Sequence, residues 1–408
     1  MTPKQIVIIG AGFGGVAVAK KLAKQGGNFE IALINEYPHH SIHGQLYEVA
    51  TSPEELTSLT ELKTSVDILL TDIFINEPVK IVIGKVTEID LVARKVVTPN
   101  KILSYDYLVC ALGAQPNFFS IPGALEHALP FQSSFDAIRI RTQIETSVQM
   151  AKSNVRQPVV HVVIAGGGVA GCEMAAEMQG MLNFVAWKNN FPREKLLTTI
   201  VDRGETVLSS FPEPVRKIAA KRLSEFGVQA KLGTTIQSIS KNSILTNSGE
   251  LPYDVLIWAA GVRANPLPTK EEQETKKGDR VVVDEYFRLA GNQNVFVLGD
   301  QCGRLDETGN ALPGTASQAI YQAGFVAAAV VSFANNQLPS GFACKQFPYL
   351  IPLGPKWAIF QSRNHLITGY FGYLIRQYVW LRYYCSILGF RRGVHWLLRT
   401  GELFSRND

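Results

Sequence analysis

The stretch that decides the fold is Ile6-Val-Ile-Ile-Gly10-Ala-Gly12-Phe-Gly14-Gly15, which is followed by VAVAKKLAKQ. A short apolar strand runs into glycines with G-x-G-x-x-G spacing, and a helix pattern rich in small residues follows. The first glycine permits a tight turn, the second lets a pyrophosphate approach the backbone, and the third lets the helix pack on the strand. Exposed N–H groups at the helix N-terminus would then face the phosphates.

A second copy of this pattern begins about midway along the chain. It reads VVIAGGGVAG over residues 162–171, with glycines at 166, 168 and 171, and CEMAAEMQGML follows it. One glycine motif is weak evidence, because glycine turns are common. Two copies, each between a strand and a helix, have the context that the motif requires. We therefore expect two dinucleotide-binding units.

The strand after each glycine loop should end in an acid that contacts the nucleotide ribose. The first unit offers FEIALINEYPHH, where Asn35 or Glu36 ends the strand, and both alternatives stay open. The second unit offers LTTIVDRGETVL, with Asp202 at the strand end. A carboxylate there accepts from a ribose 2′-hydroxyl and repels a 2′-phosphate, which favours NADH. The neighbouring Arg203 leaves NADPH open as an alternative.

Two more segments repeat each other. YDYLVCALG at residues 105–113 and YDVLIWAAG at residues 253–261 both have a YD turn, an apolar strand and a small-x-Gly end. A further strand, NVFVLGD at residues 294–300, ends in an acid. Two nucleotide-binding halves suggest two dinucleotides, one permanently held and one exchanging. The candidate residues in these segments are Ala111, Gly113, Gly261 and Asp300.

Composition excludes several classes of protein. The chain has 408 residues, 46% hydrophobic and 18% charged, as expected for a globular protein of two or three domains. A net charge of +5 without a dense basic stripe outside the C-terminus argues against nucleic-acid binding. Five widely spaced cysteines indicate neither a disulfide framework nor a metal cluster, and they favour a reducing compartment. We expect no secretory signal and no membrane span.

These motifs together resemble the two-dinucleotide-binding flavoprotein superfamily over roughly residues 4–335. Within it, four segments resemble the type II NADH:quinone oxidoreductases. They are INEYPHHSIHGQLYEVAT (34–51), GGGVAGCEMAAEM (166–178), WAAGVRANP (258–266) and SQAIYQ (317–322). The last resembles the family's A-Q-x-A-x-Q quinone motif, with both glutamines kept and Ser317 and Ile320 in place of alanines.

The resemblance implies an α/β fold with two Rossmann-like dinucleotide-binding domains, disulfide-reductase-like, plus a C-terminal membrane-binding segment. FAD would be bound by residues 1–115 and 276–335, NADH by an inserted domain at 116–275, and the membrane and a partner copy by 336–408. The implied activity is oxidation of NADH through tightly bound FAD, with two-electron reduction of a membrane quinone and no proton pumping. Hydride would pass to flavin N5, so the protein supplies alignment and electrostatics.

The resemblance also implies the site residues. Those toward FAD are Gly10, Gly12, Phe13, Gly14, Gly15, Asn35, Glu36, Ala111, Gly113, Asp300 and Gln318. Those toward NADH are Gly166, Gly168, Gly171, Glu173, Asp202, Arg203 and Gly261.

Three polar residues are candidates for the chemistry itself. Glu173 lies in the first turn of the second helix, where the helix dipole favours a carboxylate. It is either a plain helix-start charge or, as the resemblance implies, the glutamate where nicotinamide, flavin and quinone meet. Gln318 and Gln322 share one helix face at i, i+4 spacing. They are either surface glutamines or, as the resemblance implies, quinone contacts. Their apolar neighbours favour partial burial.

Cysteine positions separate the relatives. No cysteine precedes Cys110, which excludes the redox pair of disulfide reductases. Cys172 and Cys344 keep a sulfide:quinone oxidoreductase open as an alternative. A second alternative is a flavoprotein that senses NADH without turnover, because the nucleotide motifs fit it equally well.

The tail, residues 371–408, is aromatic and basic. It has six arginines (376, 382, 391, 392, 399 and 406) against Glu402 and Asp408. Aromatic rings suit the membrane interface and arginines suit anionic headgroups. The arginines do not fall on one narrow stripe, so a subunit-contact helix stays open. We expect a homodimer attached peripherally to an anionic membrane surface on its cytoplasmic face.

Overall fold

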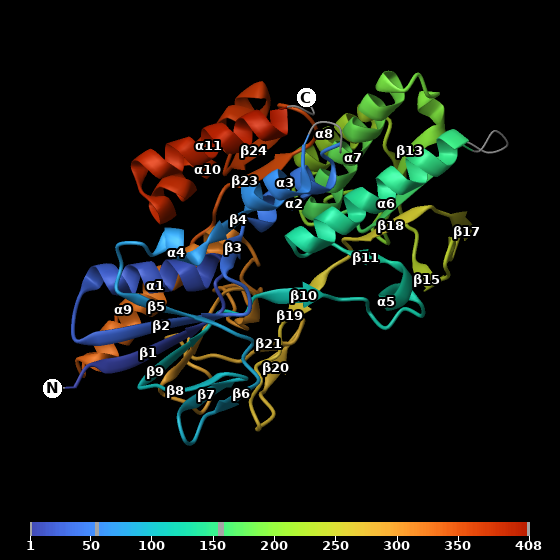
Figure 1. The fold of residues 1–408 in the computed structure, drawn as a ribbon. Coiled ribbons are helices and arrows are strands. Elements are labelled where there is room, and N and C mark those ends of the chain that lie inside the picture. The colour runs from blue at the N-terminus through green and yellow to red at the C-terminus, as the bar shows by residue number, and fades with distance from the viewer. Residues whose placement is uncertain (1, 54–56, 154–158, 406–408) are drawn as a thin grey trace. The chain divides into compact units, whose positions relative to one another are not determined.

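The computed structural model describes residues 2–53, 57–153 and 159–405, and Figure 1 traces their helices and strands. Contacts group the chain into two compact units. The first contains residues 1–41, 68–115 and 262–347, and the second contains residues 42–67, 116–261 and 348–408. Arg406 and Asp408, two of the charges counted in the tail, lie outside the described residues.

The first unit is built on a five-stranded parallel sheet. Its order is β22-β9-β1-β2-β5, with β22 at Val295–Val297, β9 at Tyr107–Cys110, β1 at Lys4–Ile9, β2 at Phe29–Asn35 and β5 at Val79–Ile83. The strands are short apolar runs, as expected where both faces of a parallel sheet are covered. Helices α1 (Phe13–Gln25) and α9 (Ala316–Ala334) pack against each other in this unit.

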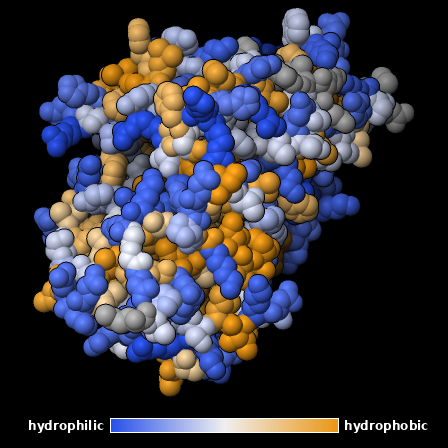
Figure 2. Space-filling model, turned by 60° about the vertical axis from the view of Figure 1, so that its left-hand side comes forward, coloured by the Kyte–Doolittle hydropathy of each residue, from blue (hydrophilic) through white to orange (hydrophobic). Residues whose placement is uncertain are grey.

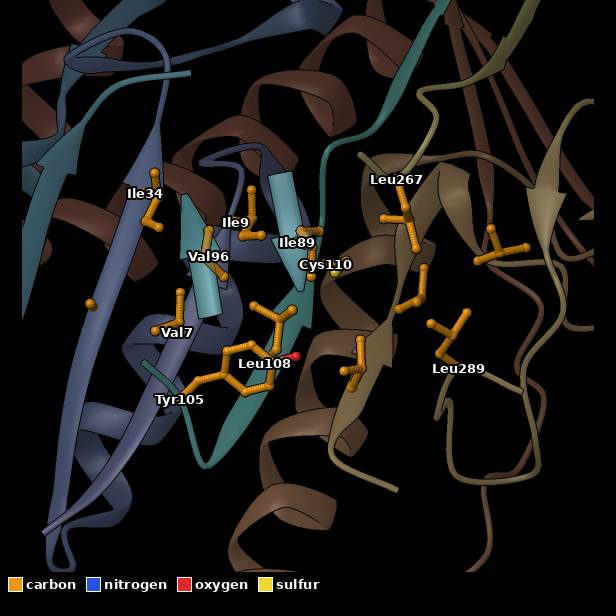
Figure 3. Packing of buried hydrophobic residues seen from close by; sticks show 14 of the residues in the cluster. Val7, Ile9, Ile34, Ile89, Val96, Tyr105, Leu108, Cys110, Leu267 and Leu289 are labelled. Carbon is orange, nitrogen blue, oxygen red and sulfur yellow. The ribbon is translucent and has the colours of Figure 1, made fainter. Parts of the chain in front are cut away.

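The core of this unit lies between the sheet and a smaller antiparallel sheet. That second sheet has the order β6-β7-β8, at Glu88–Asp90, Lys95–Thr98 and Lys101–Ser104. Figure 3 shows side chains of β1 and β9, such as Ile9 and Leu108, close to Ile89 and Val96 of the smaller sheet. These side chains are almost fully buried, so the hydrophobic effect holds the two sheets together.

The second unit repeats this plan. Its parallel sheet has the order β11-β18-β12-β13-β14, at Leu129–Pro130, Val255–Trp258, Val160–Ala165, Leu196–Val201 and Gln229–Lys231. In both sheets the strand before the glycine loop has the same two neighbours. One is the strand that follows the loop's helix (β2 or β13), and the other is the strand that follows the YD turn (β9 or β18). Helices α6 (Ser134–Ser153), α7 (Val169–Lys188) and α8 (Glu213–Phe226) belong to this unit, and so does the antiparallel sheet β15-β16-β17 at Ile236–Ile239, Ser243–Thr246 and Gly249–Pro252.

The repeated YD turns have the same structural role in each unit. Asp106 Oδ2 accepts a hydrogen bond from the Gln5 N–H at 2.7 Å, and Asp254 Oδ2 accepts one from the His161 N–H at 2.7 Å. Each aspartate therefore ties the start of its own strand to the start of the glycine-loop strand. The sequence repeat thus reflects a repeated anchor of the sheet.

The C-terminal segment clusters with the second unit. It contains the antiparallel sheet β23-β24-β25 (Tyr349–Pro352, Ala358–Ser362 and His365–Gly369) and the helices α10 (Tyr370–Leu388) and α11 (Phe390–Phe404). Strand β23 contacts α7, and so does the short helix α2 (Leu46–Ala50) from the N-terminal part. These contacts join residues 42–67 and 348–408 to the inserted unit. The boundaries of the two compact units therefore differ from those of the four predicted ranges.

The remaining short elements connect these layers. They are β3 His39–Ser41, η1 His43–Gln45, α3 Leu59–Val66, β4 Asp67–Leu69, α4 Leu70–Ile73, β10 Ala114–Pro116, α5 Ala124–His127, η2 Arg193–Lys195, β19 Val262–Ala264, β20 Thr275–Lys276, β21 Arg280–Val281 and η3 Gly299–Gln301. The predicted α/β class with two Rossmann-like units is confirmed.

Candidate functional site

The first glycine loop has the geometry of a phosphate cradle. Gly10 has φ +96°, and a Cβ atom there would lie 2.3 Å from the Ala111 carbonyl oxygen. A Cβ at Gly15 would lie 1.8 Å from the Gly10 carbonyl oxygen, so this glycine sets how closely α1 packs. At Gly12, by contrast, a Cβ would meet no described atom within 4 Å. Only this second glycine faces open space, as approach of a pyrophosphate requires.

The second loop repeats this geometry. Gly166 has φ +111°, and a Cβ there would lie 2.5 Å from the Ala259 carbonyl oxygen. A Cβ at Gly171 would lie 1.9 Å from the Gly166 carbonyl oxygen, whereas at Gly168 it would meet nothing within 4 Å in the described structure. The second residue of the motif is again the one with open space before it.

Both helices begin so that their amide groups face these openings. Gly12 is the N-cap of α1 and Gly168 that of α7, and within the described chain no side chain caps either end. Unpaired N–H groups and the positive end of the helix dipole make such an end a binding site for phosphate. The residues of both loops therefore fit a dinucleotide pyrophosphate.

Asn35, at the end of β2, holds the first loop. Its Oδ1 accepts from the Ala11 N–H at 2.9 Å, and its Nδ2 donates to the carbonyl oxygens of Tyr37 and His39 at 2.8 and 3.3 Å. The buried His40 ring lies 2.7 Å from the Ala11 carbonyl oxygen through Nδ1. The Asn35 amide is thus engaged with the backbone on both sides.

Two further candidates of the first unit stand beside that loop. The Phe13 ring packs edge-on against the His40 ring, with centroids 5.1 Å apart. Glu36, next to Asn35, is exposed. The two open alternatives for the ribose contact therefore differ, because Asn35 is a loop anchor and the Glu36 side chain is exposed to solvent.

Asp202 occupies the equivalent position at the end of β13. Its two carboxylate oxygens accept from the Gly167 and Gly204 N–H groups, both at 2.6 Å. The side chain remains partly exposed, and the neighbouring Arg203 is exposed. A partly exposed carboxylate therefore lies beside the second glycine loop.

The remaining predicted positions follow the YD strands or the GD turn. Ala111 directly follows β9, and Gly113 has φ +69° with no described atom within 4 Å of a Cβ placed there. In the second unit Gly261 has φ +150° and faces the Phe119 ring. Gly14 packs against Leu298, since a Cβ there would lie 2.3 Å from its Cδ1. Asp300 lies in η3, directly after β22.

Gln318 and Gln322 are both buried on α9 in the first unit, with 1% and 2% of their surface exposed. Gln322 Oε1 accepts from the Gly299 N–H at 2.7 Å. Neither side-chain atom of Gln318 has a hydrogen-bond partner among the described residues. A buried amide without partners indicates a ligand at that point, since such groups are normally satisfied. The sequence expectation of a buried polar face is confirmed.

Glu173 is the fifth residue of α7, so it lies just beyond the first turn in which the sequence had placed it. Its carboxyl group has a shifted pKa. Loss of solvation on burial raises its pKa to about 8, Arg376 opposes this rise, and Glu48 adds to it. The side chain is partly exposed to solvent. A carboxyl with this pKa is largely protonated at neutral pH and can give up its proton in the physiological range.

Sequence reasoning missed the residues that surround this carboxyl. The buried Arg376 guanidinium donates to Glu48 Oε1 at 2.9 Å and to the hydroxyl of Tyr47. Burial opposes the charge of Arg376, but Tyr47 and Glu48 outweigh that cost and its pKa stays above the ordinary value. Burial also raises the pKa of Tyr47 well above its usual range. The signal in the sequence was weak: the arginines of the tail, Arg376 among them, do not fall on one narrow stripe.

The tail prediction is therefore wrong for Arg376, which is buried and ion-paired inside the second unit. Other side chains of this segment remain at the surface, among them the exposed Phe371, Tyr378, Phe390 and Leu398. Figure 2 shows apolar and hydrophilic side chains mixed over the upper part of the molecule, at the height of α10 and α11. Within the described chain, one helix is apolar and long enough to cross a membrane, namely α9, and it packs against α1.

Comparison with known proteins decides the family. The family model described as pyridine nucleotide-disulphide oxidoreductase matches residues 4–323. The chain belongs to this family. It carries its nucleotide loops without redox thiols in the first loop region, because no cysteine precedes Cys110.

Among relatives in sequence, a type II NADH:quinone oxidoreductase of Staphylococcus haemolyticus is 26% identical over 348 residues, 83% of this chain and 85% of that protein. The demethylphylloquinone reductase NdbB of Synechocystis is 26% identical over 420 residues, 99% of this chain and 98% of its own. The mitochondrial external alternative NAD(P)H-ubiquinone oxidoreductase B2 of Arabidopsis thaliana is 27% identical over 331 residues, 74% of this chain, but the match spans only 55% of its length. The predicted resemblance to type II enzymes is confirmed.

The fold has solved counterparts. The structure of NDH2 from Plasmodium falciparum in complex with NADH matches with a TM-score of 0.84 and 17% identity, covering 98% of both chains. Membership of the pyridine nucleotide-disulphide oxidoreductase family supports a nicotinamide nucleotide and a flavin in general. The open glycines and the unpartnered Gln318 amide are the features of this chain that fit such ligands.

The thiols speak against sulfide chemistry. Cys172 is fully buried, its Sγ donates to the Gly167 carbonyl oxygen at 3.4 Å, and burial raises its pKa far above the usual value. A thiol in that state is a poor nucleophile, because the thiolate is the reactive form. Cys344, the other candidate, is partly exposed. The sulfide:quinone alternative is therefore less supported than the NADH reading.

Proposed function

We propose that this chain oxidises NADH and passes two electrons through FAD to a membrane quinone, without pumping protons. The observation that carries the proposal is the pair of matching cradles, each with an open second glycine at an uncapped helix start. Quinone is the acceptor named for its relatives. When bound, FAD accepts hydride from the nicotinamide and transfers the electrons onward.

The chain's own residues would bind and orient the two nucleotides. The first loop would hold the FAD pyrophosphate against the N-terminus of α1, with Asn35 and His40 supporting that loop. The second loop would hold NADH at the N-terminus of α7, and Asp202 would accept from the adenosine ribose. Asp202 also favours NADH over NADPH, because a 2′-phosphate would face its carboxylate.

Proton supply would fall to Glu173. Quinone reduction takes up two protons, and a donor works best when its pKa lies near the working pH. Glu173, with a pKa of about 8, holds a proton on its carboxyl at pH 7. Because Arg376 and Glu48 act on it from the same unit, they set how easily this proton leaves. In the first unit, the unpartnered amide of Gln318 would contribute a polar contact to a bound ligand, whereas the Gln322 carbonyl oxygen already accepts from the Gly299 N–H.

The attachment to membrane and partner is also part of the proposal. The exposed aromatic side chains of α10 and α11, with Arg382, Arg391 and Arg392 nearby in sequence, would bind an anionic membrane surface on its cytoplasmic face. The same segment would contact a second copy in a homodimer. Co-sedimentation with anionic and neutral vesicles, and the mass in detergent, test these two points.

Anaerobic stopped-flow of the detergent-solubilised yellow protein tests the central proposal. We expect fast bleaching by NADH and fast reoxidation by a short-chain quinone. A parallel run replaces NADH with sulfide, and a Cys172→Ala/Cys344→Ala variant serves as control, which should keep the NADH reaction. Bleaching by sulfide alone, lost in that variant, would instead establish the sulfide enzyme. Bleaching by NADH that quinone does not reverse would establish a sensor.

A further inference from the structure

The two glutamines of α9 are in different states, although they share one helix face. Gln322 Oε1 accepts from the Gly299 N–H at 2.7 Å, so its carbonyl is already engaged by the protein. Gln318 lies one turn earlier, where its backbone N–H donates to Thr315 Oγ1 at 3.2 Å. Its side-chain amide is fully buried, yet neither Nε2 nor Oε1 meets a partner in the described part of the chain.

Gly299, whose N–H donates to Gln322, is the first residue of the turn that contains Asp300. Gly299 has φ +72°, a left-handed conformation that only glycine adopts without strain, and it opens the turn η3. The other end of that turn is also held. Gln301 is buried, its Oε1 accepts from the Leu112 N–H at 2.8 Å, and its Nε2 donates to the Asn265 carbonyl oxygen at 2.7 Å.

Asp300 therefore lies between two anchored residues. Gln322 fixes the turn at Gly299 and Gln301 fixes it from the following position, so the backbone of Asp300 has little freedom. Helix α9 also lies directly against the turn, because a Cβ placed on Gly299 would sit 3.8 Å from the Ala319 Cβ. The Gln322 amide therefore supports the turn and is not placed to reach a ligand.

We propose that Gln322 is a positioning residue that holds the Gly299–Asp300 turn in place for the flavin, and that of the two glutamines only Gln318 contacts a ligand. The inference rests on the proposed function, since it takes FAD as the group that Asp300 serves. It gives different roles to two residues that the sequence motif names together as candidate quinone contacts.

The variants Gln322→Ala, Gln322→Glu and Gln318→Ala separate these roles. Hydrogen–deuterium exchange of the full-length protein, read on peptides covering residues 295–302, reports the turn with or without flavin. Gln322→Ala leaves the Gly299 N–H without its acceptor, so exchange there should rise about tenfold or more. Gln322→Glu keeps an oxygen acceptor and should stay close to wild type. Gln318→Ala removes an amide that makes no bond to the turn and serves as the matched control.

A second readout measures FAD affinity by flavin fluorescence. Gln322→Ala should weaken it about tenfold, with rescue by Gln322→Glu, because a mobile turn costs ordering on binding. Equal exchange in Gln322→Ala and Gln318→Ala, or a rise only in the quinone KM of Gln322→Ala, would overturn the inference. Failure of the proposed function has another signature: the exchange pattern would hold while NADH fails to bleach the protein or quinone fails to reoxidise it.

Discussion

The two glycine loops of this chain are nearly identical in backbone and different in what surrounds them. In both, the first glycine has positive φ, the second faces open space and the third touches the first. At the strand end that supports the loop, however, the first unit has the neutral Asn35 and the second has Asp202. Asn35 donates to two carbonyl oxygens and accepts once, whereas Asp202 only accepts.

This difference separates two properties of a nucleotide site. The glycines determine that a pyrophosphate can approach, and they do so alike in both units. The residue at the end of the supporting strand, Asn35 or Asp202, determines the charge beside the loop and how the loop backbone is hydrogen-bonded. The Asn35 amide bonds to the backbone through both its oxygen and its nitrogen and so supports the loop, as suits a cofactor that stays bound. A carboxylate that is partly exposed beside the loop suits a substrate that is recognised at its ribose and then dissociates.

The largest effect should come from the third glycines. Gly15→Ala and Gly171→Ala each place a methyl group within 2 Å of a carbonyl oxygen, and overpacking of this kind costs about 1–3 kcal/mol. Gly15→Ala should yield protein without flavin. Gly171→Ala should remain yellow but lose roughly 10³-fold or more in the rate of bleaching by NADH. Absorbance spectra and stopped-flow measure both, and wild-type bleaching in Gly171→Ala would refute the assignment of the second loop.

Gly341→Ala is the matched control for those variants. Gly341 is exposed, its φ is not in the left-handed region, and a Cβ there meets no described atom within 4 Å. Flavin content and NADH reactivity should therefore equal those of the wild type.

Glu173 adds a second difference between the two units, because α7 has an acidic residue just after its first turn whereas α1 has no acidic residue. If Glu173 gives a proton to quinone, turnover should fall as pH rises through about 8, where its carboxyl ionises. Glu173→Gln should lower turnover roughly 10²-fold at pH 7 and remove that inflection. The exposed Glu250→Gln is the control. An unchanged inflection in Glu173→Gln would assign it to another group.

The same pKa predicts a stability effect with a definite sign. Folding raises the pKa of Glu173 above its ordinary value of 4.5, so the fold favours the neutral carboxyl. That contribution is complete below the unfolded pKa and is lost as pH rises through about 8. The difference in melting temperature, Glu173→Gln minus wild type, should therefore increase by roughly 2–4 °C between pH 5 and pH 9.

Exchanging the strand-end residues tests the comparison directly. Asp202→Asn removes the charge that repels a 2′-phosphate, so the ratio of kcat/KM for NADPH over NADH should rise about tenfold. Asn35→Asp would turn a carboxylate toward the carbonyl oxygens of Tyr37 and His39. We expect it to destabilise the first unit by about 1–3 kcal/mol and to lower flavin retention. An unchanged NADPH ratio would shift the selection of nucleotide to Arg203.

The smallest effect should be at Glu36. Its exposed carboxylate is the remaining candidate for the ribose of the held cofactor, and a solvated hydrogen bond contributes little. Glu36→Gln should weaken FAD binding about two- to fivefold, measured by equilibrium fluorescence. The exposed Glu30→Gln is the control, and equal affinities in the two variants would remove Glu36 from the site.

Local sequence patterns were enough to predict most of the fold and both glycine loops. Glycine spacing between a strand and a helix, and the repeated YD turns, are short-range signals, and each found its expected place in a sheet. The predicted domain ranges and the tail depended on long-range packing. The Arg376–Glu48 ion pair joins residues 328 positions apart, and neither local periodicity nor composition marks such a pair.

By itself the sequence determined two dinucleotide units and the positions of their glycines between a strand and a helix, because backbone conformation and strand period are local properties. Only the tertiary structure decided that Arg376 is buried, that Glu173 keeps its proton near neutral pH and that Gln322, unlike Gln318, is bonded to the protein. The physical reason is that burial and electrostatic coupling depend on which distant segments pack around a side chain, and the chain must be folded before those neighbours exist.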